Sequence, residues 1–119
     1  MSENVLKDKS YKFALRVVKL YQHLANEKHE YVMSKQVLRS GTSVGANIEE
    51  AGQAQSKPDF IHKLSIAQKE SFETHYWIRL LRDSGILTSK SADSLLEDCA
   101  EIQKLITASI KTAKRNLAK

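Results

Sequence analysis

The spacing of apolar residues constrains this chain most, because apolar side chains recur along it at three- and four-residue intervals. Such intervals place the side chains on one face of an α-helix. The clearest case lies near the C-terminus, where one face carries Leu95, Leu96, Cys99, Ile102, Ile106, Ile110, Ala113 and Leu117. Only four Gly and one Pro occur, which is few for the many turns of a β-rich protein. The pattern predicts an all-α fold of a few long helices.

Polar and turn-forming residues divide this pattern into four predicted helices, over residues 5–26, 34–55, 58–83 and 88–116. No repeat, low-complexity segment or domain boundary interrupts them, so we expect one domain over residues 1–119. Four helices of this length joined by short loops pack as an antiparallel up-down-up-down four-helix bundle.

Residues with known preferences for helix ends mark the joints. Ser34 is the expected N-cap of the second helix. Pro58 is well placed at the start of the third helix, with Ser56 or Lys57 before it as the cap. Gly85 is expected to close the third helix in the left-handed conformation. Thr88 or Ser89 then caps the fourth.

The second predicted helix is rich in small residues, including Gly41, Gly45 and Gly52. A glycine inside a helix costs about 1 kcal/mol relative to alanine. Two interpretations account for this cost. Small residues let another helix approach closely, or the chain breaks near Ser40–Gly45 into two shorter helices.

The third predicted helix carries more apolar surface than one stripe needs. Phe60, Leu64, Ala67, Ile78 and Leu81 mark the stripe, and Ile61, Phe72, Tyr76 and Leu80 widen it. This width predicts burial on more than one side, within the bundle or at a subunit interface.

Residue patterns that carry chemistry are absent from the sequence. No Glu-x-x-His pair of the kind found in di-iron bundles occurs, and Asp59-x-x-His62 stands alone. Gly41-x-x-x-Gly45 lacks the Gly-Lys-Ser/Thr of a phosphate loop. We therefore expect no metal, no cofactor, no small-molecule substrate and no enzymatic activity. Cys99, among apolar neighbours, is better interpreted as a small buried residue than as a reactive thiol.

The N-terminal residues contain no apolar signal core, and no apolar run approaches the length that a membrane span requires. The expected location is the cytoplasm, without contact to a membrane.

Arg39 lies inside the second predicted helix, and Glu70 and Glu73 lie among mostly apolar neighbours in the middle of the third. If these three charged side chains are buried, they need partners. We hypothesise that Arg39 meets Glu70 or Glu73 across two helices, with Ser40, Ser43 and Asn47 supplying hydrogen bonds. The alternative is that all three are ordinary solvated charges.

The chain is basic, with a net charge of +5 and a pI of about 9.4. Its last 16 residues contain no acid and include Lys104, Lys111, Lys114 and Arg115. Such clustering suits contact with the phosphates of RNA or DNA. Cations near a helix C-terminus also complement the helix dipole without any ligand, so both interpretations remain open.

Two segments resemble a known family: Arg39-Ser-Gly-Thr-Ser-Val-Gly-Ala-Asn-Ile-Glu-Glu-Ala51, and Asp59-Phe-Ile-His-Lys-Leu-Ser-Ile-Ala-Gln-Lys-Glu70 with Glu73, Tyr76-Trp77 and Leu80-Leu81. Together they are similar to the bacterial four-helix-bundle proteins encoded in intervening sequences of 23S ribosomal RNA genes. The resemblance runs from about Tyr11 to Lys114. The family pattern falls on Arg39, Ser40, Ser43, Ala46, Asn47, Glu50, Ala51, Glu70, Glu73 and Trp77, which look like fold-defining positions.

The resemblance implies a homo-oligomer, with a ring-like pentamer as the expected form, and no established enzymatic activity. It also implies similarity to the basic accessory protein of diversity-generating retroelements, a pentamer thought to bind nucleic acid and a reverse transcriptase. The present chain is less basic than that relative. Two functions therefore compete: a nucleic-acid-associated accessory protein, and a structural or protein-interaction module that binds no nucleic acid.

Overall fold

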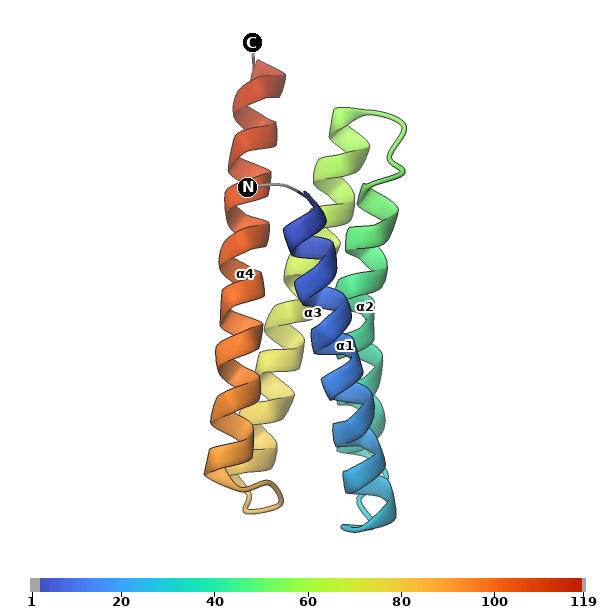
Figure 1. Cartoon of the computed structure of the whole chain (residues 1–119), viewed down its shortest axis with the longest axis vertical. Coiled ribbons are helices and arrows are strands. Elements are labelled where there is room, and N and C mark those ends of the chain that lie inside the picture. Colours follow the sequence, from blue (N-terminus) through green and yellow to red (C-terminus); the bar gives the residue numbers. More distant parts are fainter. Residues whose placement is uncertain (1–2, 119) are drawn as a thin grey trace.

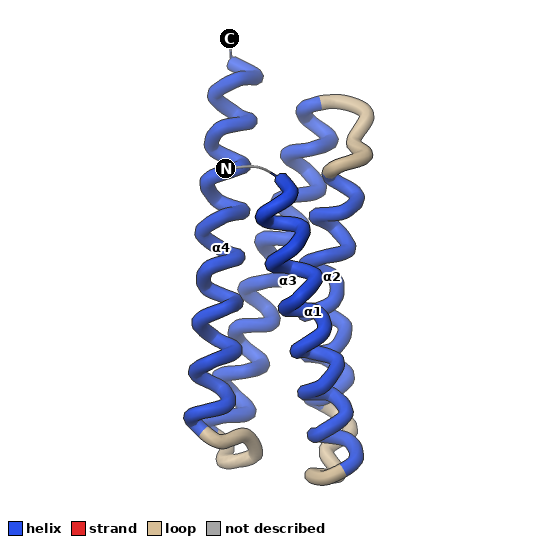
Figure 2. The backbone as a smooth tube through the Cα atoms, viewed as in Figure 1, coloured by secondary structure: helices blue, strands red, loops and turns tan. Residues whose placement is uncertain are grey.

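The computed structural model describes residues 3–118, with the side chains of residues 5–118. Four helices make up most of this span: α1 (Glu3–Asn26), α2 (Met33–Ala51), α3 (Lys57–Asp83) and α4 (Ser89–Ala118). They run alternately up and down a body of 51 × 21 × 19 Å (Figure 1). Short connections join them, and the described span contains no strand (Figure 2). The predicted all-α antiparallel bundle is confirmed.

Each helix packs against its two neighbours around a single core. The adjacent pairs are α1–α2, α2–α3, α3–α4 and α1–α4, while within residues 3–118 the backbones of the diagonal pairs do not approach each other closely. Every helix contributes fully buried side chains, such as Phe13, Val44, Ile78 and Ile106. Burying one such side chain stabilises the fold by roughly 1.5–3 kcal/mol.

Close packing of α1 on α2 explains Gly41. A Cβ atom added at Gly41 would lie 2.7 Å from Val17 Cγ1, which is closer than two carbons can approach. One added at Gly45 would lie 3.4 Å from the Ser10 carbonyl oxygen. Gly41 therefore lets α1 lie close against α2, whereas a methyl group at Gly45 would make an ordinary contact. The helix is continuous from Met33 to Ala51, so the alternative of a break near Ser40–Gly45 is wrong.

Both ends of α2 differ from the prediction. Ser34 is not the N-cap but a buried residue inside the first turn. The carboxylate of Glu30 replaces it by accepting hydrogen bonds from the backbone N–H groups of Val32, Met33 and Ser34 at 2.7–3.1 Å. The helix ends at Ala51 rather than residue 55, because the chain turns immediately afterwards toward the cap of α3.

The remaining caps follow the sequence signals. Ser56 is the N-cap of α3, and its hydroxyl accepts a hydrogen bond from the Asp59 N–H at 3.2 Å. Gly85 has a φ of 82°, which glycine adopts without strain. The Thr88 hydroxyl accepts from the Ser91 N–H at 3.2 Å at the start of α4.

Candidate nucleic-acid interface

The basic part of α4 lies in its last four turns. Lys104, Lys111 and Arg115 are spaced by seven and four residues, so they project from one side of the helix. Lys114 lies on the adjoining side, one heptad after Thr107, which contacts α3 through Gln68. All four cationic side chains are exposed. The four residues singled out in the sequence therefore form one continuous basic surface.

A shallow groove of about 380 Å³ runs beside this surface, between α3 and α4. Lys104 and Lys111 line it together with Phe72, Gln68 and Gln103. The Phe72 ring is 57% exposed. Lysines can pair with phosphates, and an exposed aromatic face can stack on a base. The groove thus combines the two kinds of side chain that hold single-stranded nucleic acid. We name this set, with Lys114 and Arg115, the basic groove.

The basic residues of α1 are arranged differently, because acidic partners neutralise most of them. Lys9 pairs with Glu101 at 2.5 Å, Arg16 with Asp98 at 2.6 Å, and Lys12 with Asp8 at 3.1 Å. By contrast, no ion pair joins the basic-groove cations to a carboxylate among the described residues. The end of α4 therefore carries four exposed cations without an ion pair among the described residues, and Lys19, Lys28 and Lys35 at the opposite end of the bundle also lack one.

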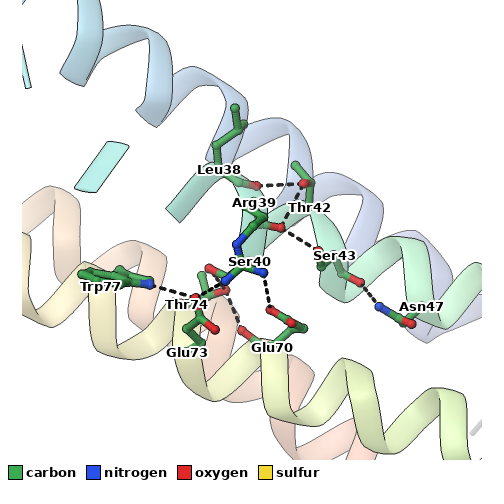
Figure 3. Close-up of polar contacts among 10 residues, drawn as sticks. All are labelled: Leu38, Arg39, Ser40, Thr42, Ser43, Asn47, Glu70, Glu73, Thr74 and Trp77. Carbon is green, nitrogen blue, oxygen red and sulfur yellow. Dashed lines mark hydrogen bonds and ion pairs between the residues drawn. The ribbon is translucent and has the colours of Figure 1, made fainter. Parts of the chain in front are cut away.

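A second polar cluster lies where α2 meets α3 (Figure 3). The Arg39 guanidinium forms an ion pair with Glu73, and its other terminal nitrogen lies 3.7 Å from Glu70 Oε2. The indole N–H of Trp77 donates to the same Glu73 carboxylate at 3.1 Å. The structure therefore brings together the three charged residues that the sequence hypothesis joined. We call Arg39, Glu70, Glu73 and Trp77 the polar seam.

The serines and asparagine expected in this cluster have other partners. Ser43 donates to the Arg39 carbonyl at 2.7 Å, and Asn47 donates to the Ser43 carbonyl at 2.9 Å, both within α2. Ser40 does cross to α3, where it accepts from the Thr74 hydroxyl at 2.9 Å in the core. Ser43 and Asn47 thus donate hydrogen bonds to backbone carbonyls of their own helix and not to the carboxylates of Glu70 and Glu73. Thr74 was missed in the sequence analysis.

The polar seam is partly open to solvent. The Arg39 side chain is 54% exposed, while Glu70 is 15% exposed and Glu73 is 31% exposed. The hydrogen bond from Trp77, followed by the ion pair with Arg39, lowers the pKa of Glu73 against the opposing effect of burial. An exposed pair of this kind contributes at most about 1 kcal/mol. The seam therefore joins α2 to α3 but contributes little to overall stability.

Three of the residues that widen the apolar surface of α3 are exposed in a single copy of the chain, and so are two apolar residues of α1. Phe72, Tyr76 and Leu80, which follow one another at four-residue intervals on α3, are 57%, 50% and 37% exposed. Tyr11 and Leu15 on α1 are 63% and 49% exposed. The wide apolar surface of the third helix is therefore not buried inside the bundle.

Cys99 is buried, and its thiol donates to the Ser71 carbonyl at 3.3 Å. Burial raises the pKa of this thiol to about 12, so it is almost entirely protonated near neutral pH. Within the described part of the chain, no cluster of His, Cys, Asp and Glu is arranged to hold a metal ion. No helix between residues 3 and 118 combines the length and apolarity needed to cross a membrane.

The fold and these surfaces define a small four-helix-bundle protein with a charged seam between two helices and a basic end on a third. The sequence model of the 23S rRNA-intervening sequence protein family matches residues 2–108. The chain therefore belongs to the 23S rRNA-intervening sequence protein family. Lys111, Lys114 and Arg115 lie beyond the matched residues.

A solved structure agrees with this assignment. A protein of unknown function from the S23 ribosomal protein family of Bacteroides thetaiotaomicron is 56% identical in sequence and superposes with a TM-score of 0.92. The match covers 93% of the present chain and 99% of that protein. None of the curated proteins matches this chain.

Proposed function

We propose that this protein is a non-enzymatic, homo-oligomeric member of its family that binds RNA or DNA through the basic groove. The observation that carries the proposal is the placement of Lys104 and Lys111 beside the exposed ring of Phe72. Cations without an ion pair would bind the phosphates, and the exposed aromatic ring would stack on a base of the same nucleic acid. Helix-dipole stabilisation accounts for the lysines but gives no reason for an exposed phenylalanine beside them in the same groove.

Self-association would strengthen such binding. A ring of five chains would carry a charge of about +25 from the +5 of each chain, and clustered cations increase the attraction for phosphates. The exposed apolar residues of α1 and α3 support an assembly, because these two helices lie diagonally across the bundle and their exposed residues face solvent in one copy. The Tyr76 and Leu80 side of one copy could cover the Tyr11 and Leu15 side of the next. Contacts between unlike faces generate rings when the rotation closes.

The test measures binding of a fluorescent single-stranded RNA by anisotropy at two salt concentrations. We expect Lys111→Ala, Lys114→Ala and Arg115→Ala together to abolish binding in physiological salt. The matched control removes three exposed lysines at the opposite end, by Lys19→Ala, Lys28→Ala and Lys35→Ala, and so makes the same change in net charge. Equal affinities of the two triple variants would refute a localised interface.

A structural or protein-interaction role without nucleic acid is the second candidate. The stripe of Phe72, Tyr76 and Leu80 favours it, since an exposed apolar stripe is also a common protein-binding surface. Light scattering coupled to size exclusion measures the molecular mass with and without RNA, and this distinguishes the two candidate functions. A mass near five times 13.5 kDa that increases with RNA at low salt supports nucleic-acid binding, and an oligomer indifferent to RNA supports the second candidate. A monomer would refute the assembly.

A further inference from the structure

The two walls of the basic groove carry different kinds of side chain. The α4 wall provides Lys104 and Lys111, which are seven residues apart and therefore about 10 Å apart along the helix axis. The α3 wall provides Gln68 and Phe72, with no charged residue among those that line the groove. Phosphates are therefore attracted to the α4 wall, and the base attached to such a phosphate comes to lie next to the Phe72 ring.

The row of cations on α4 has a defined length and direction. Arg115 continues it one turn beyond Lys111, so three cations cover about 16 Å along one side of the helix. One heptad before Lys104, the same side of α4 carries Glu97, which is exposed and repels phosphates. The favourable path therefore runs from Lys104 toward the C-terminal end of α4. At the spacing of about 3.4 Å between phosphates of a stacked strand, this path accommodates about five nucleotides.

A duplex fits this arrangement poorly for two reasons. The faces of its bases are covered by neighbouring base pairs, so a base reaches the Phe72 ring only after costly unstacking or flipping. A duplex also presents a line of phosphates on each side of its grooves, whereas the basic groove has cations on its α4 wall alone. A single strand has free base faces and one line of phosphates. The placement of charge and ring in the basic groove therefore matches one strand.

The polar side chains beside Phe72 do not select one base. Gln68 and Gln103 line the groove, and each amide carries both hydrogen-bond donors and an acceptor. The Gln68 amide nitrogen already donates to the Thr107 hydroxyl at 2.5 Å, which holds it between α3 and α4. Stacking on an aromatic ring is open to every base, because every base has a π face. The groove is therefore suited to a strand of any sequence.

We propose that the basic groove binds a single-stranded nucleic acid in preference to a duplex, with the phosphates along α4 and one base stacked on Phe72. This inference rests on the proposed function and specifies its ligand, a single strand of any sequence with about five nucleotides per chain. The groove contacts phosphates and base faces, which RNA and DNA share. Binding therefore depends on the bases of the strand as well as on its charge.

Three fluorescent DNA probes of twelve nucleotides test the proposal: a mixed-sequence single strand, its duplex, and an abasic strand with the same number of phosphates. Anisotropy measures their binding to the whole chain in physiological salt, and we expect the single strand to bind most tightly. Phe72→Leu keeps an apolar side chain but removes the ring. It should weaken binding of the single strand about fivefold or more and leave the abasic strand and the duplex unchanged. An RNA strand of the same sequence should bind as the DNA strand does.

Two variants control for the loss of the ring. Phe72→Trp retains a flat aromatic ring, so it should bind the single strand at least as tightly as the parent chain. Tyr31→Leu removes a ring of similar exposure, 54% against 57%, from the connection between α1 and α2. It should bind all three probes as the parent does. Light scattering should give the same oligomer mass for every variant.

Other outcomes overturn the preference for a single strand. A duplex that binds as tightly as the single strand would do so, as would a Phe72→Leu variant with unchanged affinity or with an equal loss for all three probes. A loss of oligomer mass in Phe72→Leu would assign the ring to a contact between copies. The proposed function fails in a different way: the parent chain then binds no probe, or the triple variant of Lys111, Lys114 and Arg115 binds as its control does.

Discussion

Replacing Gly41 with alanine tests whether close packing of α1 on α2 requires a glycine. In an ordinary helix this change would stabilise the fold by about 1 kcal/mol through helix propensity. Here the new methyl group would meet both Val17 methyls, at 2.7 and 2.8 Å. Val17 is fully buried and β-branched, so it cannot rotate away.

The expected net effect follows from these two opposing contributions. Overpacking of this kind costs about 1–3 kcal/mol, which exceeds the propensity gain over most of that range. The middle of that range leaves a net loss of about 1 kcal/mol, which in a domain of this size lowers the melting temperature by roughly 3–5 °C. Thermal and urea unfolding followed by circular dichroism, at one protein concentration, provides the measurement.

Two further variants make the result specific. Gly45→Ala meets the Ser10 carbonyl oxygen at 3.4 Å, an ordinary contact, so it should be neutral or stabilising by up to about 1 kcal/mol. In a Val17→Ala background the two methyl groups at 2.7 and 2.8 Å are gone and only the Cβ of residue 17 remains, at 3.2 Å, so Gly41→Ala should destabilise less. A Gly41→Ala variant as stable as the parent, or one equally destabilised with alanine at position 17, would refute the packing argument.

Two other predictions concern groups whose pKa the fold shifts. The Cys99 thiol, with its pKa raised to about 12, should resist alkylation by iodoacetamide at pH 8 in the folded protein and react once urea unfolds it; rapid reaction in the native state would contradict its burial. Glu73 has its pKa lowered by Trp77 and Arg39, so its contribution to stability is present above the ordinary pKa near 4.5 and is lost as the pH falls through the lower, folded value. Trp77→Phe should raise the pKa of Glu73 in a carboxyl NMR titration, whereas an unchanged titration would show that the indole hydrogen bond is unimportant.

Local sequence patterns were sufficient for the helices and most of their ends. The Ser56-x-Pro58 signal and Gly85 act through backbone conformation and short-range hydrogen bonds, so neighbouring residues decide them. The start of α2 is different, because the side chain that accepts its first backbone N–H groups is Glu30 and not the predicted cap Ser34. Glu30 lies four residues before Ser34 and accepts three backbone N–H groups at once, which a serine hydroxyl cannot do.

Apolar periodicity by itself also determined the fold class, since stripes repeating every three to four residues can be buried together only by helices packed side by side. It did not decide which apolar residues stay exposed. Phe72 fits the helical pattern as well as Leu64 does, yet it faces outward because the four helices of one copy have only one shared interior. The same holds for function: the lysines of α4 are visible in the sequence, but their place beside Phe72 arises only when α3 and α4 pack together.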